Sequence, residues 1–191
     1  ISQIEIRQSF SAGALLAILY SENKQGLTEA AGRWLPHLSN QPGLTGIAGL
    51  LPHHSAARPI SIYGQLYLEE KFEKVRLRYG PECFFQVNLP QLLQVVDELK
   101  TWLKANKPAR LLDLYAGVGT FSFFLSTLAS EVLAVESEPA NIFYFKENLT
   151  LNKTTNIKLV AGRVEQRLNE IKAFQPEAAI VDPPRKGLEP E

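Results

Sequence analysis

LLDLYAGVGTFS, residues 111–122, gives the clearest structural signal in this 191-residue chain. A short apolar run ends at Tyr115, a turn with two glycines follows, and an apolar segment typical of a helix begins near Thr120. Only a residue without a Cβ atom lets the backbone pass close to a ligand, so Gly117 and Gly119 indicate a binding turn. Strand, tight turn and helix in this order predict the first unit of a nucleotide-binding α/β sheet.

The same alternation of short apolar runs and longer amphipathic segments continues along the rest of the chain. We expect strands over 110–115, 131–136, 157–160 and 178–182, with helices over 120–130, 139–152 and 164–174. This order predicts a parallel sheet with helices on both faces. Ligands of such sheets lie beyond the carboxyl ends of the strands, where the sequence has Asp113, Tyr115, Glu136 and Asp182.

Residues 1–82 have a different pattern, which predicts a small α+β domain. The expected elements are two strands within 2–20, a helix over 27–38, and strands over 43–51, 60–68 and 74–79. Thr28 is the expected N-cap of the helix, and Pro36 is expected to end or bend it. Gly80-Pro81 marks the boundary, so residues 83–191 form the second domain, which opens with a long amphipathic helix over about 90–105.

Composition excludes several classes of protein. Hydrophobic content of 45% and charged content of 21% are those of an ordinary folded domain. No apolar run approaches the roughly 18–20 residues that cross a bilayer. The single cysteine, Cys83, excludes an internal disulfide and a cysteine-based metal or iron–sulfur site, so we expect no metal and a reducing, cytoplasmic setting. The pair His53-His54 has no ligand partner at a suitable spacing and is expected to be part of a loop.

The net charge is zero, and its distribution is only mildly uneven. Residues 1–110 hold 12 basic and 9 acidic residues, whereas residues 111–191 hold 8 and 11. This does not predict a protein that binds nucleic acid by charge alone. The basic stripe of the first domain has two open interpretations: contact with RNA phosphates, or a solvated face balanced by nearby glutamates (Lys71, Lys74, Arg76 and Arg78 against Glu69, Glu70 and Glu73).

The turn and the next strand end bear on the identity of the ligand. Glu136 follows Asp113 by 23 residues, and an acidic residue there can accept hydrogen bonds from the ribose of a dinucleotide or of S-adenosylmethionine. A dinucleotide turn has a third glycine, where this sequence has Phe121. Asp113 adds negative charge near the position of a diphosphate, which favours the cationic S-adenosylmethionine over NAD.

DPPRKG, residues 182–187, closes the fourth strand of the alternating region. Enzymes that methylate amino groups have an aromatic residue after the two prolines, but this sequence has Arg185. Arginine makes bidentate contacts with phosphates and carbonyls. The motif therefore favours a polyanionic substrate over exocyclic-amine chemistry.

Four motifs together resemble the RNA uracil-5-methyltransferase family. They are FQVN (85–88), LDLYAGVGTF (112–121), VE (135–136) and DPPRKG (182–187), in the family's order and covering about residues 84–188. The resemblance implies a Rossmann-like S-adenosylmethionine-dependent methyltransferase core, with a truncated parallel sheet, preceded by the α+β domain. It also implies an RNA substrate, either transfer RNA or 23S ribosomal RNA, that is methylated at uracil C5.

By this resemblance, Gln86, Tyr115, Glu136 and Asp182 bind S-adenosylmethionine. The family's catalytic cysteine and glutamate base follow the DPPR motif and are expected after residue 191. We therefore predict no catalytic residue in this chain, which on its own should be inactive. The absence of methionine and the end of the chain just after DPPR suggest a piece of a longer protein. The alternatives are an NAD-dependent oxidoreductase domain and a non-catalytic RNA-binding module.

Overall fold

The computed structural model describes residues 1–51 and 59–183, which form two compact units. One unit contains Ile1–Lys74 and Arg78–Cys83, and the other contains Val75–Leu77 and Phe84–Glu191. The functional division predicted between residues 82 and 83 stays a prediction. The His53-His54 pair and residues 184–187 of the DPPRKG motif lie outside the described residues.

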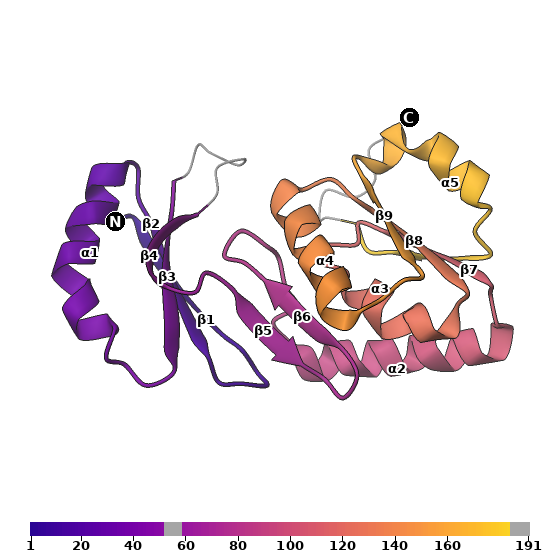
Figure 1. Ribbon diagram of the computed structural model, residues 1–191, viewed down its shortest axis with the longest axis horizontal. Coiled ribbons are helices and arrows are strands. Elements are labelled where there is room, and N and C mark those ends of the chain that lie inside the picture. The colour runs from indigo at the N-terminus through magenta and orange to yellow at the C-terminus, as the bar shows by residue number, and fades with distance from the viewer. Residues whose placement is uncertain (52–58, 184–191) are drawn as a thin grey trace. The chain divides into compact units, whose positions relative to one another are not determined.

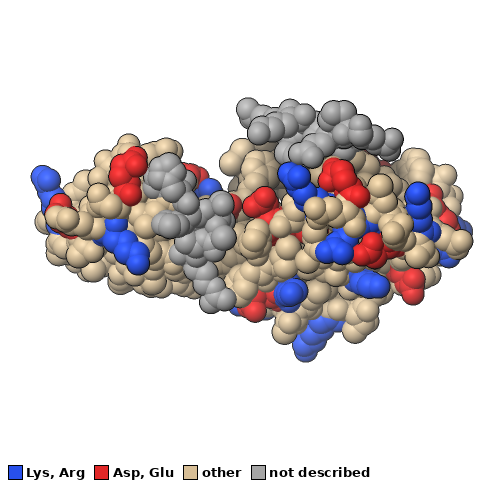
Figure 2. Space-filling view, turned by 90° about the horizontal axis from the view of Figure 1, so that it is seen from above, with Lys and Arg blue, Asp and Glu red and all other residues tan. Residues whose placement is uncertain are grey.

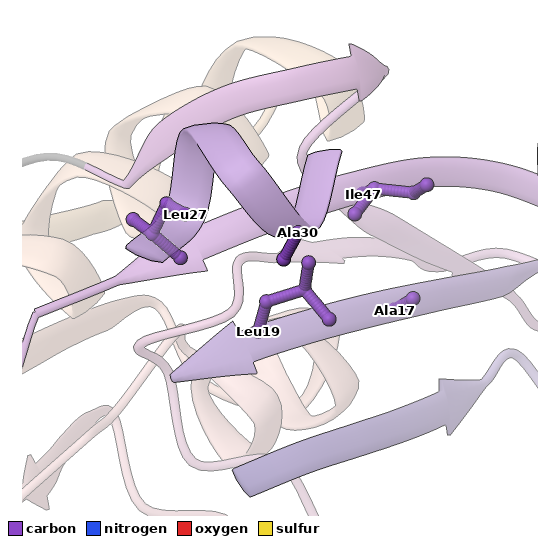
Figure 3. Packing of buried hydrophobic residues seen from close by; sticks show 5 residues of the cluster. All are labelled: Ala17, Leu19, Leu27, Ala30 and Ile47. Carbon is purple, nitrogen blue, oxygen red and sulfur yellow. The ribbon is translucent and has the colours of Figure 1, made fainter. Parts of the chain in front are cut away.

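The first unit contains a four-stranded sheet with the order β1-β2-β3-β4. Its elements are β1 (Gln3–Gln8), β2 (Leu15–Tyr20), α1 (Lys24–Leu38), β3 (Leu44–Leu50) and β4 (Ile60–Gly64). The inner strands β2 and β3 are parallel and are connected by α1, whereas both outer strands pair antiparallel. Helix α1 lies on one face of the sheet, and its apolar side chains meet those of β2 and β3 (Figure 3).

Helix α1 begins earlier than its sequence predicts and ends at the predicted residue, Leu38. Its N-cap is Asn23, whose side-chain oxygen accepts the Gly26 N–H at 2.8 Å, so the predicted Thr28 cap is wrong. Pro36 lies inside the helix, which continues to Leu38. Because only a few residues follow Pro36, its missing N–H costs a single hydrogen bond near the helix end, where bonding is already incomplete.

The strand predicted over 60–68 is two strands that belong to different sheets. Gly64, with φ of +59°, ends β4, and β5 (Leu68–Lys71) then pairs with β6 (Arg76–Tyr79) in a two-stranded sheet. A left-handed φ is accessible to glycine at little cost, so the chain turns at this residue.

The basic stripe of this region is partly neutralised within the molecule. The Arg78 guanidinium bonds to Glu69 at 2.8 Å and lies over the Tyr67 ring, 4.7 Å from its centroid. Glu70 is fully buried and accepts the N–H groups of Phe10 and Ser11, so its interpretation as part of a solvated face is wrong. Basic and acidic side chains are interspersed on the face seen in Figure 2.

The second unit has the predicted alternation of strands and helices. Its elements are α2 (Leu89–Asn106), β7 (Arg110–Leu114), α3 (Thr120–Leu125), η1 (Ser126–Leu128), β8 (Glu131–Glu136), α4 (Pro139–Asn152), β9 (Ile157–Ala161), η2 (Val164–Gln166), α5 (Leu168–Phe174) and β10 (Ala178–Val181). The four strands are all parallel, in the order β10-β7-β8-β9. This arrangement confirms the predicted α/β fold.

Helices cover both faces of the parallel sheet (Figure 1). On one face, Ile171 and Phe174 of α5 pack against a cluster formed by Leu112, Leu133 and Val135. Phe123 of α3 and Phe145 of α4 pack with their ring centroids 5.3 Å apart and their planes tilted by 44°. The rings belong to helices of successive right-handed crossovers, which lie on the same face of a sheet when the strand order advances in one direction.

Three helices of this unit end on a residue that is not glycine but has a left-handed backbone. These residues are Lys107 after α2, Lys153 after α4 and Gln175 after α5, with φ between 47° and 53°. Each donates its N–H to a carbonyl of the last turn of its helix, as the left-handed cap requires. In the part of the chain that is described, no helix is both long and apolar enough to cross a membrane.

Asp113 fixes the beginning of α3 to the end of β7. Its buried carboxyl accepts the Ser122 N–H at 3.0 Å and the Ser122 hydroxyl at 2.6 Å. Complete burial raises the pKa of Asp113 to about 7, although both hydrogen bonds oppose this shift. The side chain therefore has a structural role that its position before the glycine turn does not reveal.

We predict that Phe145→Ala lowers the free energy of unfolding by about 3–5 kcal/mol, because its ring is fully buried. Phe143→Ala, in the same helix, is the matched control, since the Phe143 side chain is 49% exposed and should cost less than about 1 kcal/mol. Urea unfolding followed by Trp102 fluorescence in a Trp34→Phe background reports on the second unit. Equal decreases in the free energy of unfolding of Phe145→Ala and Phe143→Ala would contradict the described packing.

We also predict a pH-dependent contribution of Asp113 to stability. Its pKa rises from 3.8 to about 7 on folding, so the folded state binds the proton more tightly. The contribution is complete below about pH 4 and is lost as the pH rises to 7, by an amount on the order of a few kcal/mol. Urea unfolding of Asp113→Asn should lack this dependence, whereas the exposed Asp97→Asn should retain it. Parallel stability curves for wild type and Asp113→Asn would refute the assignment.

Candidate active site

The candidate site lies at the carboxyl edge of the parallel sheet. The register pairs Val181 with Leu114 and Leu114 with Val135, so β10, β7 and β8 end side by side. Tyr115, Glu136 and Asp182 stand at these three strand ends. The structure therefore brings three of the four predicted cofactor-binding residues to one edge.

Glu136 organises this edge through its backbone contacts. Its carboxylate accepts the Ser137 and Glu138 N–H groups at one oxygen, at 2.6 and 2.7 Å, and the Gly117 N–H at the other, at 2.7 Å. The residue is only 6% exposed, so water does not compete with these bonds. A carboxylate has about four acceptor positions, which leaves about one for a ligand hydroxyl.

The two glycines of the turn are needed for different reasons. Gly117 has φ of +59°, and a Cβ atom placed on it would meet no atom within 4 Å, so the turn faces open space there. Gly119 has φ of +95°, and its Cβ would collide with the rings of Phe123 and Phe145. Gly117 thus leaves room for a ligand, whereas Gly119 allows the helices to pack.

Tyr115 has a strained backbone next to this turn. Its φ of 59° is left-handed, which costs a residue with a side chain about 1–2 kcal/mol. Its hydroxyl lies 3.4 Å from the Glu165 carboxylate, which follows β9. The left-handed backbone directs the chain from β7 into the turn, and such strain is typical of functional sites.

The remaining two predicted residues have less restricted surroundings. Asp182 follows β10 directly and is exposed. Gln86 is half-buried in the irregular segment before α2, and no hydrogen bond in the described part of the chain joins it to the other three residues. The roles of all four residues in cofactor binding stay predictions.

The site is electrostatically negative. Besides its burial, the nearby carboxylates of Asp182 and Glu136 raise the pKa of Asp113. Both carboxylates therefore oppose the ionisation of Asp113. Among the described residues, no group of three or more His, Cys, Asp or Glu side chains is arranged to hold a metal ion.

Two positions that hold the site together were not identified from the sequence. Ser122 binds Asp113, and Asn148 of α4 donates its side-chain amide to the Val118 carbonyl at 3.0 Å. Asn148 is fully buried, in the same helix as the buried Phe145. An asparagine among the apolar residues of a helix could have indicated this role, because a buried side-chain amide must have a hydrogen-bond partner.

Comparisons with known proteins identify the family of the chain. A family profile described as tRNA (uracil-5-)-methyltransferase matches residues 62–191. An uncharacterized RNA methyltransferase of Thermosynechococcus vestitus is 30% identical over 97% of this chain and 42% of its own length. One of Lactobacillus johnsonii is 33% identical over 69% of this chain and 29% of its own length. The chain thus spans about two fifths or less of these relatives.

Solved structures share the fold. The Pyrococcus abyssi tRNA (uracil-54, C5)-methyltransferase, solved with S-adenosyl-L-homocysteine, has a TM-score of 0.73 at 20% identity, over 98% of this chain and 44% of its own. The Methanocaldococcus jannaschii tRNA m1G37 methyltransferase has a TM-score of 0.57 at 16% identity, over 97% of this chain and 55% of its own. These similarities confirm the predicted Rossmann-like methyltransferase fold.

The family profile covers well over half of the chain. The resemblance seen in the sequence is therefore confirmed: the chain belongs to the tRNA (uracil-5-)-methyltransferase family.

Proposed function

We propose that this chain is the cofactor-binding part of an RNA methyltransferase that uses S-adenosylmethionine. The observation that carries the proposal is the pair of carboxylates, Glu136 and Asp182, at the strand ends beside the open turn at Gly117. S-adenosylmethionine carries a sulfonium and an ammonium, which this negative edge attracts. A dinucleotide would bring the two negative charges of its pyrophosphate to the same place.

The four predicted residues have distinct proposed roles. Glu136 accepts a ribose hydroxyl at its remaining acceptor position, and Tyr115 packs its ring against the cofactor. Asp182 lies by the methyl donor, where a carboxylate stabilises the positive charge, and Gln86 offers an amide donor and acceptor. These roles follow the family motifs, and the strand-end positions of Tyr115, Glu136 and Asp182 support them.

The proposed reaction is methylation of uracil C5 in RNA. A cysteine thiolate adds to C6, and the resulting nucleophilic C5 attacks the methyl group, which breaks the bond from carbon to sulfur and releases S-adenosylhomocysteine. A base then removes the C5 proton, and the thiolate is eliminated. Cys83 is 1% exposed and is not available for this attack, so the thiol comes from outside these 191 residues.

The proposed substrate is transfer RNA or 23S ribosomal RNA. The matching family and the similar Pyrococcus abyssi enzyme are both named for tRNA, which favours transfer RNA. An RNA substrate and a single buried cysteine are compatible with the cytoplasm.

The chain should bind S-adenosylhomocysteine but not NADH, as measured by isothermal titration calorimetry. Glu136→Gln should weaken binding by about 10- to 100-fold, because a charge-assisted acceptor is lost. Glu131→Gln is the matched control, since Glu131 is exposed at the opposite end of β8. Binding of NADH alone would favour the oxidoreductase alternative, and equal affinities of the two glutamine variants would refute the role of Glu136.

The full-length protein should transfer tritiated methyl from S-adenosylmethionine to RNA, with the label recovered as 5-methyluridine after digestion to nucleosides. Cys83→Ala should leave this rate unchanged, because the buried thiol takes no part in the reaction. Residues 1–191 alone should bind the cofactor without transferring label. Label found only on cytosine or protein would reject uracil C5 chemistry, and RNA binding without any transfer would favour a non-catalytic module.

A further inference from the structure

Three asparagines follow one another at intervals of four residues around the end of α4. Asn148 and Asn152 lie in the last turns of the helix, and Asn156 follows it. The amide of Asn156 donates to the carbonyls of Ser126 and Ala129, at 2.8 and 3.2 Å. Each of the three side chains thus holds a backbone segment that is distant in the sequence.

Asn148 holds the glycine turn. Its side-chain amide donates to the carbonyl of Val118, which lies between the two glycines and is itself buried. Water cannot replace a donor at this position, so loss of the amide would leave a buried carbonyl without this partner. The same turn provides the Gly117 N–H that binds Glu136.

Asn152 holds the first residue of β6 to the same helix. Its side-chain oxygen accepts the Arg76 N–H at 2.8 Å, and its amide donates to the Arg76 carbonyl at 2.7 Å. A single side chain thus satisfies both backbone groups of Arg76, as a neighbouring strand would. The same amide also donates to the Asn148 carbonyl at 2.8 Å.

These bonds form a continuous path from β6 to the glycine turn. Asn152 binds Arg76 and donates to the backbone carbonyl of Asn148, and the Asn148 side chain donates to Val118, each bond being 3.0 Å or less. The two halves of the path are joined by the covalent bonds of Asn148 itself. Both ends of the path are backbone groups, so the path constrains the course of the chain at β6 and at the turn. Helix α4 is the common support of the two segments.

We propose that Asn148 and Asn152 are positioning residues for the cofactor, which couple the state of β6 to the glycine turn. This inference rests on the proposed binding of S-adenosylmethionine. In the described part of the chain, the hydrogen bonds of Asn152 reach Arg76 and the Asn148 carbonyl but not the turn, Glu136 or Asp182, so it acts on cofactor affinity through Asn148. Because coupling is reciprocal, cofactor binding in turn strengthens the contact between Asn152 and Arg76.

The test measures S-adenosylhomocysteine affinity by calorimetry in aspartate variants. Asn148→Asp and Asn152→Asp keep the size of the side chain and remove its amide donor. Asn148→Asp should weaken binding by about 5- to 100-fold and Asn152→Asp by about 3- to 10-fold. The double variant should lose less than the product of the two factors, since both act through one path.

Asn106→Asp is the matched control. Asn106 is the last residue of α2, as Asn152 is of α4, and its amide also donates to the carbonyl four residues earlier, at 2.9 Å. Asn106→Asp places the same unfavourable charge at a helix end, but the Asn106 side chain has no described bond to another segment. Its affinity should stay within about twofold of wild type, which removes general helix destabilisation as an explanation.

Hydrogen exchange gives a second readout that a purely structural role would not change. The Arg76 amide should exchange more slowly when S-adenosylhomocysteine is bound to the wild type, and this protection should disappear in Asn148→Asp. The inference, but not the proposed function, would be overturned if Asn152→Asp bound S-adenosylhomocysteine with wild-type affinity. The same would follow if the exchange rate of the Arg76 amide did not change when the ligand was bound. No binding to the wild type would instead overturn the proposed function on which it rests.

Discussion

The carboxylate of Glu136 is the constraint on which the geometry of the site depends. It binds backbone N–H groups from the loops after β7 and β8, and the Glu136 carbonyl accepts the Gly162 N–H after β9 at 2.8 Å. One residue therefore joins the loops that follow three neighbouring strands. Because it is buried, these charge-assisted bonds keep their strength. The backbone of the open turn is held to this carboxylate through the Gly117 N–H.

The residues at the carboxyl ends of the strands lower the stability of the folded protein, and the same residues support the proposed function. Burial, and to a smaller extent the charges of Asp182 and Glu136, oppose the ionisation of Asp113. Tyr115 adds backbone strain at the same place. Natural proteins accept such local costs at sites that must hold a ligand, because optimal packing there would fill the site. A bound cation would relieve the repulsion, so the free site is the less stable of the two states.

The sequence was sufficient to predict the second unit because its signals are local. Apolar runs and the glycine turn lie within a few residues of the elements they determine, and those elements are present. The first unit was harder. Asn23 and Thr28 are both residue types that cap helices, and the continuous pattern over 60–68 conceals the turn at Gly64. When two nearby residues could both begin a helix or end a strand, the local sequence does not show which of them does so in the folded protein.

The site was predictable to a similar extent. Strand ends locate Tyr115, Glu136 and Asp182 at one edge, since parallel strands in register must end together. The bonds that hold the edge join residues distant in sequence, such as Gly117 to Glu136 and Val118 to Asn148, and leave no periodic trace. For the same reason Asp113 was expected to act on the ligand alone, whereas it also binds Ser122.

The left-handed residues at three helix ends have a consequence for engineering. Lys107, Lys153 and Gln175 occupy a conformation that glycine adopts without steric cost. All three lie outside the carboxyl edge, so the glycine content of these caps can be raised without altering the site. The helices of this unit thus offer independent positions at which the thermal tolerance of the protein can be improved while its cofactor chemistry is kept.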